Sequence, residues 1–310
     1  MAFERITTRQ LPDGFVSKVY PFHISLEGME SVVLCRTPDD YDTMIKYFHV
    51  CTWVNNVLVI IDVAMSNHGH LAVLAMDLDS ARRAGESIKK NYSQYFTWKY
   101  GERRTLLRAD VNVQYLDSDW YLRNTLAYIP RNALDAGSSV EEYPWSSYRA
   151  MFQKNGKLRE GRKVALLSRR DKESLFHTHA DLKDVPWRVD RSGRLDPASA
   201  CDIAYLEDAF NHDQAFFLKT IGTVNCAEMH QKLVSGPRQR QKDDEFYLTV
   251  MEIADRWFHK SPAELSLEMK TRLLPYLWRC YRTSPHQLAR CLRLDLRQVE
   301  EILLHNTFPR

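Results

Sequence analysis

The stretch Asp62-Val63-Ala64-Met65-Ser66-Asn67-His68-Gly69-His70-Leu71-Ala72-Val73 decides the fold. Apolar runs at 57–61 and 71–74 predict two buried strands joined by a Ser-Asn turn. Because successive strand side chains point to opposite faces, His68 and His70 should project from one face, about 7 Å apart. Two imidazoles in this arrangement suit one divalent ion. The alternative is a histidine pair that serves only the packing of the sheet.

The composition indicates an ordinary globular protein. With 310 residues, 44% of them hydrophobic, the chain can form two or three domains. The N-terminus lacks an apolar signal region and no run is long enough to span a bilayer, so we expect a cytoplasmic protein with no membrane partner. The net charge of +3 is only a weak indication of a polyanionic partner.

The cysteines show no C-x-x-C pair, so we predict reduced thiols and no zinc or disulfide role. They are Cys35, Cys51, Cys201, Cys226, Cys280 and Cys291.

Periodicity and capping residues predict the elements before residue 150. In chain order these are strands at 18–26 and 31–35, a helix at 37–54, the two strands of the histidine stretch, a helix at 77–100 closed by Gly101, a strand at 110–116, and a helix after Asp117-Ser118-Asp119. The first two strands should form a hairpin. The order does not alternate strictly, which excludes a parallel α/β sheet. It predicts an α+β domain with an antiparallel sheet and helices on one face.

The last of these helices carries a second group of candidate residues. Tyr128 and Asn132 lie four residues apart and therefore share a helical face. This face offers a phenol nucleophile and, one turn later, an amide oxygen for a metal. Pro130 between them should kink the helix rather than end it. The alternative is that Tyr128 is a core aromatic residue and that Asn132 belongs to a helix end.

Five segments occur in the order and spacing of the single-tyrosine HUH transposases, and residues 16–150 resemble the REP-associated tyrosine transposases in particular. The segments are Phe22-His23-Ile24, Asp39-Asp40-Tyr41, Met65-Ser66-Asn67-His68-Gly69-His70-Leu71, Tyr128-Ile129-Pro130-Arg131-Asn132 and Tyr143-Pro144-Trp145-Ser146-Ser147-Tyr148. The resemblance implies a ferredoxin-like antiparallel sheet and an enzyme that nicks single-stranded DNA beside a hairpin.

By this resemblance His68 and His70 are paired metal ligands, Tyr128 is the nucleophile, and Asn132 supplies a third, amide-type ligand. One departure is that the usual Asn-Pro after the tyrosine reads Asn132-Ala133 here, with a proline at 130 instead. Tyr92 and Tyr95, on the preceding helix, are rival nucleophiles.

Elementary chemistry agrees with these roles. A phenol with a pKa near 10 needs a cation or a base to become nucleophilic at neutral pH. A divalent ion would also polarise the scissile phosphate. Attack on phosphorus gives a 5′-phosphotyrosine and a free 3′-hydroxyl, which conserves the bond energy, so no nucleotide cofactor is expected. Nitrogen and oxygen ligands with open positions suit Mg²⁺ or Mn²⁺, and the ligand types do not exclude zinc.

A second H-x-H motif, His177-Thr178-His179 followed by Asp181, matches the H-x-H-x-D pattern of metal-dependent hydrolases. No further histidine or acid cluster of suitable pattern follows it. We therefore predict an exposed connector at this position rather than a hydrolase site.

Residues 151–236 are predicted to be a basic connector followed by a small helical unit at 197–221. The basic residues between 154 and 170 either touch phosphates or form a plain surface loop. The breaker and charge pattern of 236–242 indicates a linker.

Residues 237–310 are predicted to form a helical DNA-binding domain. A helix interrupted by Pro275 is followed by a helix at 286–292, a short turn, and a final helix capped by Asp295, which is a helix-turn-helix pattern. The segment loosely resembles the DNA-binding tails of replication initiators. The alternative is three-helix packing for protein contacts. The predicted DNA-contacting residues are Arg293, Arg297 and Gln298, together with Lys89 and Lys90 of the 77–100 helix.

The sequence thus predicts an α+β HUH nuclease domain followed by an all-α region. The expected reaction is DNA strand transfer on single-stranded hairpins such as REP-like repeats, with a homodimer left open. The opposing hypothesis is a catalytically inactive DNA-binding regulator that keeps the nuclease fold as a scaffold.

Overall fold

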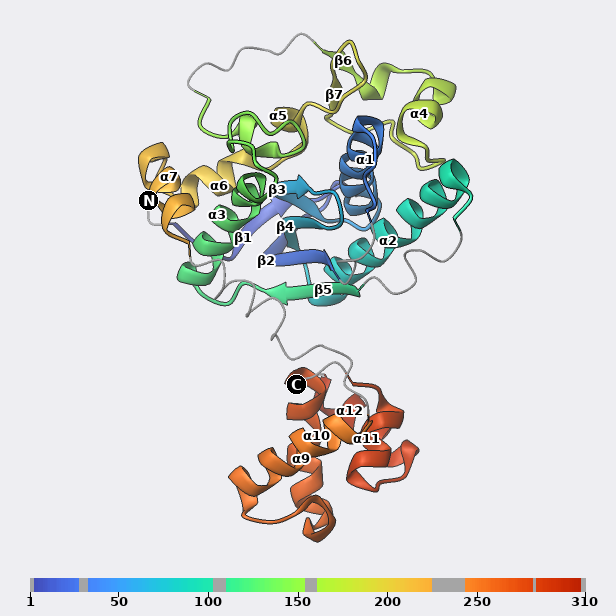
Figure 1. Ribbon diagram of the computed structural model, residues 1–310, viewed down its shortest axis with the longest axis vertical. Helices are drawn as coiled ribbons and strands as arrows, with labels where there is room; N and C mark the ends of the chain where they lie inside the picture. The colour runs from blue at the N-terminus through green and yellow to red at the C-terminus, as the bar shows by residue number, and fades with distance from the viewer. Residues whose placement is uncertain are drawn as a thin grey trace. The chain divides into compact units, whose positions relative to one another are not determined.

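The computed structural model describes residues 3–27, 33–102, 110–153, 161–224, 243–280 and 283–307. The chain divides into two units, residues 1–225 and 226–310 (Figure 1). No helix within the described ranges is both long and apolar enough to cross a membrane.

The first unit is built on an antiparallel sheet with the strand order β5-β2-β4-β3. Its elements are β2 (Val16–Glu27), α1 (Pro38–Val54), β3 (Leu58–Ala64), β4 (Gly69–Ala75), α2 (Leu78–Tyr100) and β5 (Asp110–Tyr115). A short strand, β1 (Thr7–Gln10), pairs with the first residues of β2, on the part of β2 that β5 does not reach. The antiparallel α+β prediction is therefore confirmed.

Helices cover both faces of this sheet. Apolar side chains of β2 and β4, among them Ile24 and Leu71, enter one core with α1 and α2. The alternate residues, such as His70, face the other side, where α3 (Asp119–Asp135) contacts β3 and β4 (Figure 1). The prediction of helices on one face is correct for α1 and α2 and wrong for α3. Because β4 is buried along its whole length, its second face also needs a cover.

The predicted helix starts are confirmed by their caps. Thr37 forms a capping box with Asp40 at the start of α1. Asp77 accepts a hydrogen bond from the backbone of Ser80 (2.6 Å) at the start of α2, which ends at Gly101 with φ +70°. Ser118 caps α3 by accepting from the backbone N–H of Tyr121, and the helix continues through Pro130.

The predicted strand at 31–35 is wrong where the structure describes it. Residues 33–35 are not in a strand, and residues 31 and 32 lie outside the described ranges. The N–H groups of Leu34 and Cys35 donate instead to the carbonyl of Ser66, at 2.7 and 2.9 Å. A hairpin partner has no place because β4 occupies one edge of β2, while β1 and β5 occupy the other.

The described part of the predicted connector belongs to the first unit. α4 (Arg169–Phe176) contacts α1, while α6 (Ile203–Ala209) and α7 (Gln214–Thr223) contact α3. The elements after α3 are η1 (Ser147–Ala150), β6 (Arg162–Lys163), η2 (Val164–Leu166), α4 (Arg169–Phe176), β7 (Arg188–Val189), α5 (Pro197–Ala200), α6 (Ile203–Ala209) and α7 (Gln214–Thr223). Residues 154–160 of the predicted basic loop lie outside the described ranges.

The second unit is helical, with its own apolar core. Its elements are α9 (Asp243–Phe258), η3 (Pro262–Glu264), α10 (Leu267–Cys280), α11 (Pro285–Leu292) and α12 (Leu296–Thr307). Ser284 and Asp295 cap α11 and α12 as predicted, by accepting from the backbone N–H groups of Gln287 (3.1 Å) and Arg297 (2.9 Å). α10 runs through Pro275 without the predicted interruption. The predicted linker at 236–242 lies outside the described residues.

Candidate active site

The turn between β3 and β4 is fixed at its ends by backbone hydrogen bonds. Met65 N–H donates to the carbonyl of His68 at 2.8 Å. Gly69 lies against α1 so closely that an added Cβ would come within 2.6 Å of the Phe48 ring. Because Gly69 faces α1, the histidines before and after it turn to the opposite face of the sheet.

The segment 143–148 supports the strand that leads into this turn. Trp145 O accepts a hydrogen bond from Ala64 N (2.9 Å), and the Tyr143 hydroxyl donates to Ala64 O (2.8 Å). The indole of Trp145 stacks on Tyr41, with ring centroids 4.0 Å apart. Two segments of the family resemblance therefore have a structural role, because they hold the end of β3 and α1 together.

The structure brings four predicted site residues together on one face. The rings of His68 and His70 have centroids 5.0 Å apart. The ring of Tyr128 meets His70 edge-on at 5.4 Å, and the Asn132 Oδ1 atom lies 3.4 Å from His68 Nε2. His70, Tyr128 and Asn132 are buried, whereas His68 is partly exposed. The cluster is therefore accessible from the side of His68.

The orientation of Asn132 is set by its own helix. Its Nδ2 atom donates to the carbonyls of Tyr128 (2.9 Å) and Ile129 (3.1 Å), which turns Oδ1 toward His68. His68 Nδ1 lies 2.7 Å from Asn67 Oδ1 and Nε2 lies 3.4 Å from Asn132 Oδ1, so the shorter contact favours the tautomer with the ring hydrogen on Nδ1. The lone pair of Nε2 then faces Asn132 Oδ1.

These donor atoms fit a divalent cation. Two ligand atoms, each about 2.1 Å from one ion, lie about 3.0–3.4 Å apart. The separation of His68 Nε2 and Asn132 Oδ1 is 3.4 Å. Two atoms that both present lone pairs at this distance are stabilised by a cation between them.

His23 is a site residue to which the sequence analysis assigned no role. Its ring lies 5.2 Å from that of His70 with an interplanar angle of 31°. It is 1% exposed, and neither ring nitrogen has a hydrogen-bond partner among the described residues. Burial lowers the pKa of His23 to about 3, so the ring is neutral. Strand alternation could have found it, because His23 and Ser25 of β2 share the face of His70.

The rival nucleophiles belong to the other core. Tyr92 is 1% exposed and donates to Leu34 O at 3.0 Å, and burial raises its pKa far above the usual range. The Tyr95 hydroxyl donates to the carboxylates of Asp39 (3.1 Å) and Asp40 (2.9 Å). Both tyrosines are packed with α1 and α2, on the sheet face opposite to His70. The structure does not bring them to the histidine pair.

The predicted DNA-contacting lysines are also on α2. Lys90 is exposed and Lys89 is partly exposed, and the helix that carries them covers the sheet face away from Tyr128. Arg293, Arg297 and Gln298 are exposed around the turn between α11 and α12. The side chain of Gln298 accepts from the backbone of Asp295 at 3.3 Å, so it helps to cap α12.

The second H-x-H motif forms no metal site in the part of the chain that the structure describes. His177 ends α4 in a left-handed conformation, with φ +47°. His179 is 87% exposed on its side chain and lies 3.2 Å from Glu173, while Asp181 pairs with Lys183 at 3.3 Å. The predicted exposed connector therefore describes His179 correctly.

No family model matches the chain, and no curated protein does. One similar solved structure is described as "Structure of the REP associates tyrosine transposase bound to a REP hairpin". It shares 14% sequence identity with this chain and covers 48% of this chain and 84% of that chain, with a TM-score of 0.31. A likeness of this size does not establish function, which must come from the side chains described above.

Proposed function

We propose that the chain is a DNA nuclease and strand transferase of the single-tyrosine HUH type, acting on single-stranded DNA beside hairpins such as REP-like repeats. The observation that carries the proposal is the meeting of His68, His70, Asn132 and Tyr128 on one face of the sheet. His68 comes from the turn just before β4, His70 from β4, and Tyr128 and Asn132 from α3. The order of the five resembling segments supports the same class.

His68 Nε2, a ring nitrogen of His70 and Asn132 Oδ1 would hold Mg²⁺ or Mn²⁺. Bound there, the ion would stabilise negative charge on the non-bridging oxygens of the scissile phosphate. The protein contributes a preorganised set of donors. Asn67 fixes the tautomer of His68, and two carbonyls of α3 fix the amide of Asn132.

Tyr128 would supply the nucleophile. Its phenol oxygen forms a bond to phosphorus, the bond from phosphorus to the 3′-oxygen breaks, and the phenol proton passes through solvent to the leaving 3′-oxygen. The product is a 5′-phosphotyrosine with a free 3′-hydroxyl. Attack by a 3′-hydroxyl reverses the step and restores the phenol, so no nucleotide cofactor is needed.

We extend the proposal to the remaining predicted features. The βαββαβ order with the spatial order β5-β2-β4-β3 supports a ferredoxin-like arrangement. In the second unit, the exposed side chains at the α11–α12 turn support DNA contacts by Arg293, Arg297 and Gln298. Lys89 and Lys90 would add charge for a flanking strand. A homodimer would allow two DNA ends to be cut together.

A covalent-adduct experiment tests the proposal. The full chain is incubated with Mn²⁺ and labelled single-stranded hairpin DNA, and the products are separated on a denaturing gel. We expect a protein adduct that carries the fragment 3′ to the nick, and Tyr128→Phe should abolish it. Tyr92→Phe is the matched control and should leave the adduct in place. An adduct that persists in Tyr128→Phe would assign the nucleophile to another tyrosine.

The burial of Tyr128 favours a second candidate function. The residue is only 6% exposed, so a phosphate reaches the phenol only if the neighbouring side chains move. A chain in which they do not move would be a DNA-binding regulator with the same fold. Retarded migration of the hairpin on a native gel, without any adduct on the denaturing gel, would support this candidate.

A further inference from the structure

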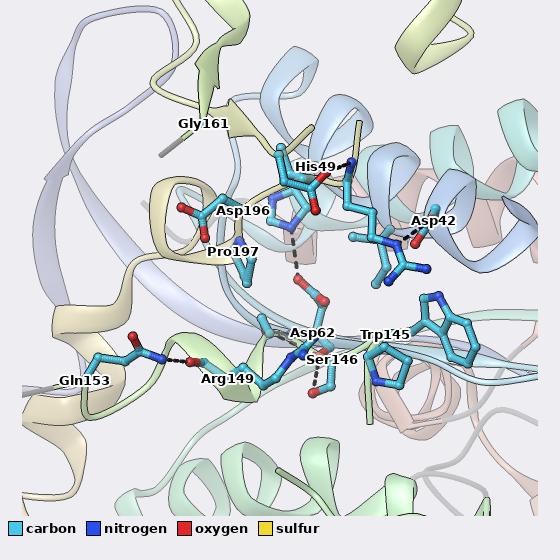
Figure 2. Close-up of a pocket in the computed structure, with 16 residues that line it drawn as sticks. Asp42, His49, Asp62, Trp145, Ser146, Arg149, Gln153, Gly161, Asp196 and Pro197 are labelled. Carbon is cyan, nitrogen blue, oxygen red and sulfur yellow. Dashed lines mark hydrogen bonds and ion pairs between the residues drawn. The ribbon is translucent and has the colours of Figure 1, made fainter. Parts of the chain in front are cut away.

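A second group of potential ligands lies on α1, β3 and the segment after α5. His49 Nε2 lies 3.0 Å from Asp62 Oδ2, and the Cys201 Sγ atom lies 3.8 Å from the same oxygen. The three ligand atoms are all within 4.8 Å of one another. Figure 2 shows the carboxylate of Asp62 directed at the ring of His49. These residues are 13 and 139 positions apart in sequence, so no short motif marks them.

The backbone around the group is fixed by contacts between separate elements. Asp62 N–H donates to Ser147 Oγ at 2.7 Å. Cys201 forms an isolated parallel bridge with Val59, and Asp202 N–H donates to Val59 O at 2.7 Å, which holds the thiol beside β3. The three donors are therefore placed by the fold and not by flexible surface side chains.

The group is buried yet can be reached by an ion. The side chains of His49 and Asp62 are each 1% exposed. Both nevertheless line a cavity of about 530 Å³ (Figure 2), and His49 and Cys201 line a second cavity of about 340 Å³. A buried carboxylate is costly unless a cation or several donors stabilise it. The cavities provide both an entry path and room for a water molecule.

We propose that His49 Nε2, Asp62 Oδ2 and Cys201 Sγ bind a zinc ion whose fourth position faces the larger cavity. Nitrogen, oxygen and sulfur donors in one tetrahedral site are the ligands that zinc accepts. Tetrahedral zinc places such atoms about 3.4–3.6 Å apart. The two separations of 3.0 and 3.8 Å need changes of a few tenths of an ångström. A carboxylate and a thiolate together neutralise the charge of the ion.

The site would tie the segment after α5 to the edge of the sheet. This zinc site shares no residue with the cluster of His68, His70 and Asn132, and its thiol donor gives it a different metal preference. The sequence analysis predicted no zinc role for any cysteine, on the ground that no C-x-x-C pair occurs. Zinc ligands drawn from three separate elements leave no such pattern.

Cobalt is the probe that distinguishes this site from the histidine pair. The purified full chain is stripped with a chelator and titrated with Co²⁺. A thiolate ligand gives a charge-transfer band in the near ultraviolet, which imidazole and amide ligands do not give. We expect the band to reach a plateau during the titration and to disappear when Zn²⁺ is added. It should be lost in Cys201→Ser, kept in the matched control Cys51→Ser, and kept in His68→Ala, whatever the outcome for nicking.

The Co²⁺ titration of the wild-type protein tests the proposal even if a variant fails to fold. No charge-transfer band would overturn the proposal and leave a buried hydrogen bond between His49 and Asp62 beside an inert thiol. A band that survives in a folded Cys201→Ser protein would also overturn it. As a second readout, Zn²⁺ should raise the melting temperature of the wild type and of Cys51→Ser, but not that of Cys201→Ser.

Discussion

The chain contains the same three-residue pattern twice, and the two copies end in different surroundings. His68 directly precedes the buried strand β4, which begins with Gly69 and His70, and the two imidazole rings lie 5.0 Å apart on the side of α3. His177-Thr178-His179 follows a helix, and there His177 contacts the ring of Tyr95 while His179 pairs with Glu173. Spacing alone therefore does not make a ligand pair. A strand must hold both rings on one face, and a further element must add the remaining ligands.

The residue between the histidines shows the same contrast. Gly69 has no room for a side chain, because Phe48 lies where a Cβ would be. Thr178 is partly exposed and only accepts a hydrogen bond from the backbone of Ala180, at 3.2 Å. The central residue of the first pattern, Gly69, packs in the core, and that of the second, Thr178, lies at the surface.

The largest expected difference between the two copies is in catalysis. Replacement of both His68 and His70 by alanine should reduce adduct formation more than about 100-fold, because two of three metal ligands are lost. The matched double variant at His177 and His179 should change it less than about two-fold. Initial rates of adduct formation on labelled hairpin DNA measure both. Equal losses in the two variants would remove the functional distinction between the copies.

The ion-pair network beside His177 should matter for stability instead. Asp40 accepts hydrogen bonds from Lys99 Nζ (2.7 Å), the Tyr100 hydroxyl (2.6 Å) and the Thr37 N–H (2.8 Å). Burial by itself would raise the pKa of Asp40. The hydrogen bonds together outweigh burial, so the net pKa is lowered to about 2. Asp40→Asn should therefore cost about 3 kcal/mol of unfolding free energy at pH 7.

The pH dependence gives the control for Asp40. Its folded pKa lies below the unfolded value, so its stabilisation is present above about pH 4 and is lost as the pH falls toward 2. Urea unfolding at pH 7, 4.5 and 3 should show the gap between wild type and Asp40→Asn narrowing at the lowest pH. The exposed pair of Asp79 and Arg82 serves as a control, and Asp79→Asn should cost less than about 0.5 kcal/mol. If the difference in unfolding free energy between wild type and Asp40→Asn stays constant with pH, the stabilisation does not come from the charged form of Asp40.

The central residue of each pattern offers a sharper test of packing. Gly69→Ala places a methyl group within 2.6 Å of the Phe48 ring, which is fully buried, and should cost about 1–3 kcal/mol. Thr178→Ala should stay within about 0.5 kcal/mol of wild type. Urea unfolding at pH 7 compares the two. A Gly69→Ala variant as stable as wild type would show that α1 can move away from the turn.

The smallest expected effect concerns the third ligand. Asn132→Leu removes the amide oxygen near His68 and should lower the apparent affinity for Mn²⁺ about ten-fold. The measurement is the Mn²⁺ concentration that gives half-maximal adduct formation. Asn124→Leu is the matched control on the same helix, since the exposed Asn124 side chain donates a hydrogen bond within its own helix, to Trp120 O at 2.8 Å. The same Mn²⁺ requirement in both variants would exclude Asn132 as a ligand.

Local chemistry was enough to predict much of the fold. Thr37, Asp77 and Ser118 each begin a helix because a short polar side chain satisfies the first N–H groups, whatever lies further away. The strand predicted at 31–35 failed because pairing depends on a free edge, and β2 has none left. The sequence analysis placed His23 on a strand but did not place it beside His70, because His70 belongs to another strand and the pairing register is set by the sheet.

The sequence by itself determined the secondary structure around the site, the shared face of His68 and His70, and the shared face of Tyr128 and Asn132. These follow from the two-residue period of strands and the turn of a helix. Only the tertiary structure decided that α3 covers the second face of the sheet, which brings the phenol to the imidazoles. It alone joined His49, Asp62 and Cys201, because contacts across 139 residues depend on how buried surfaces pack and not on any local period.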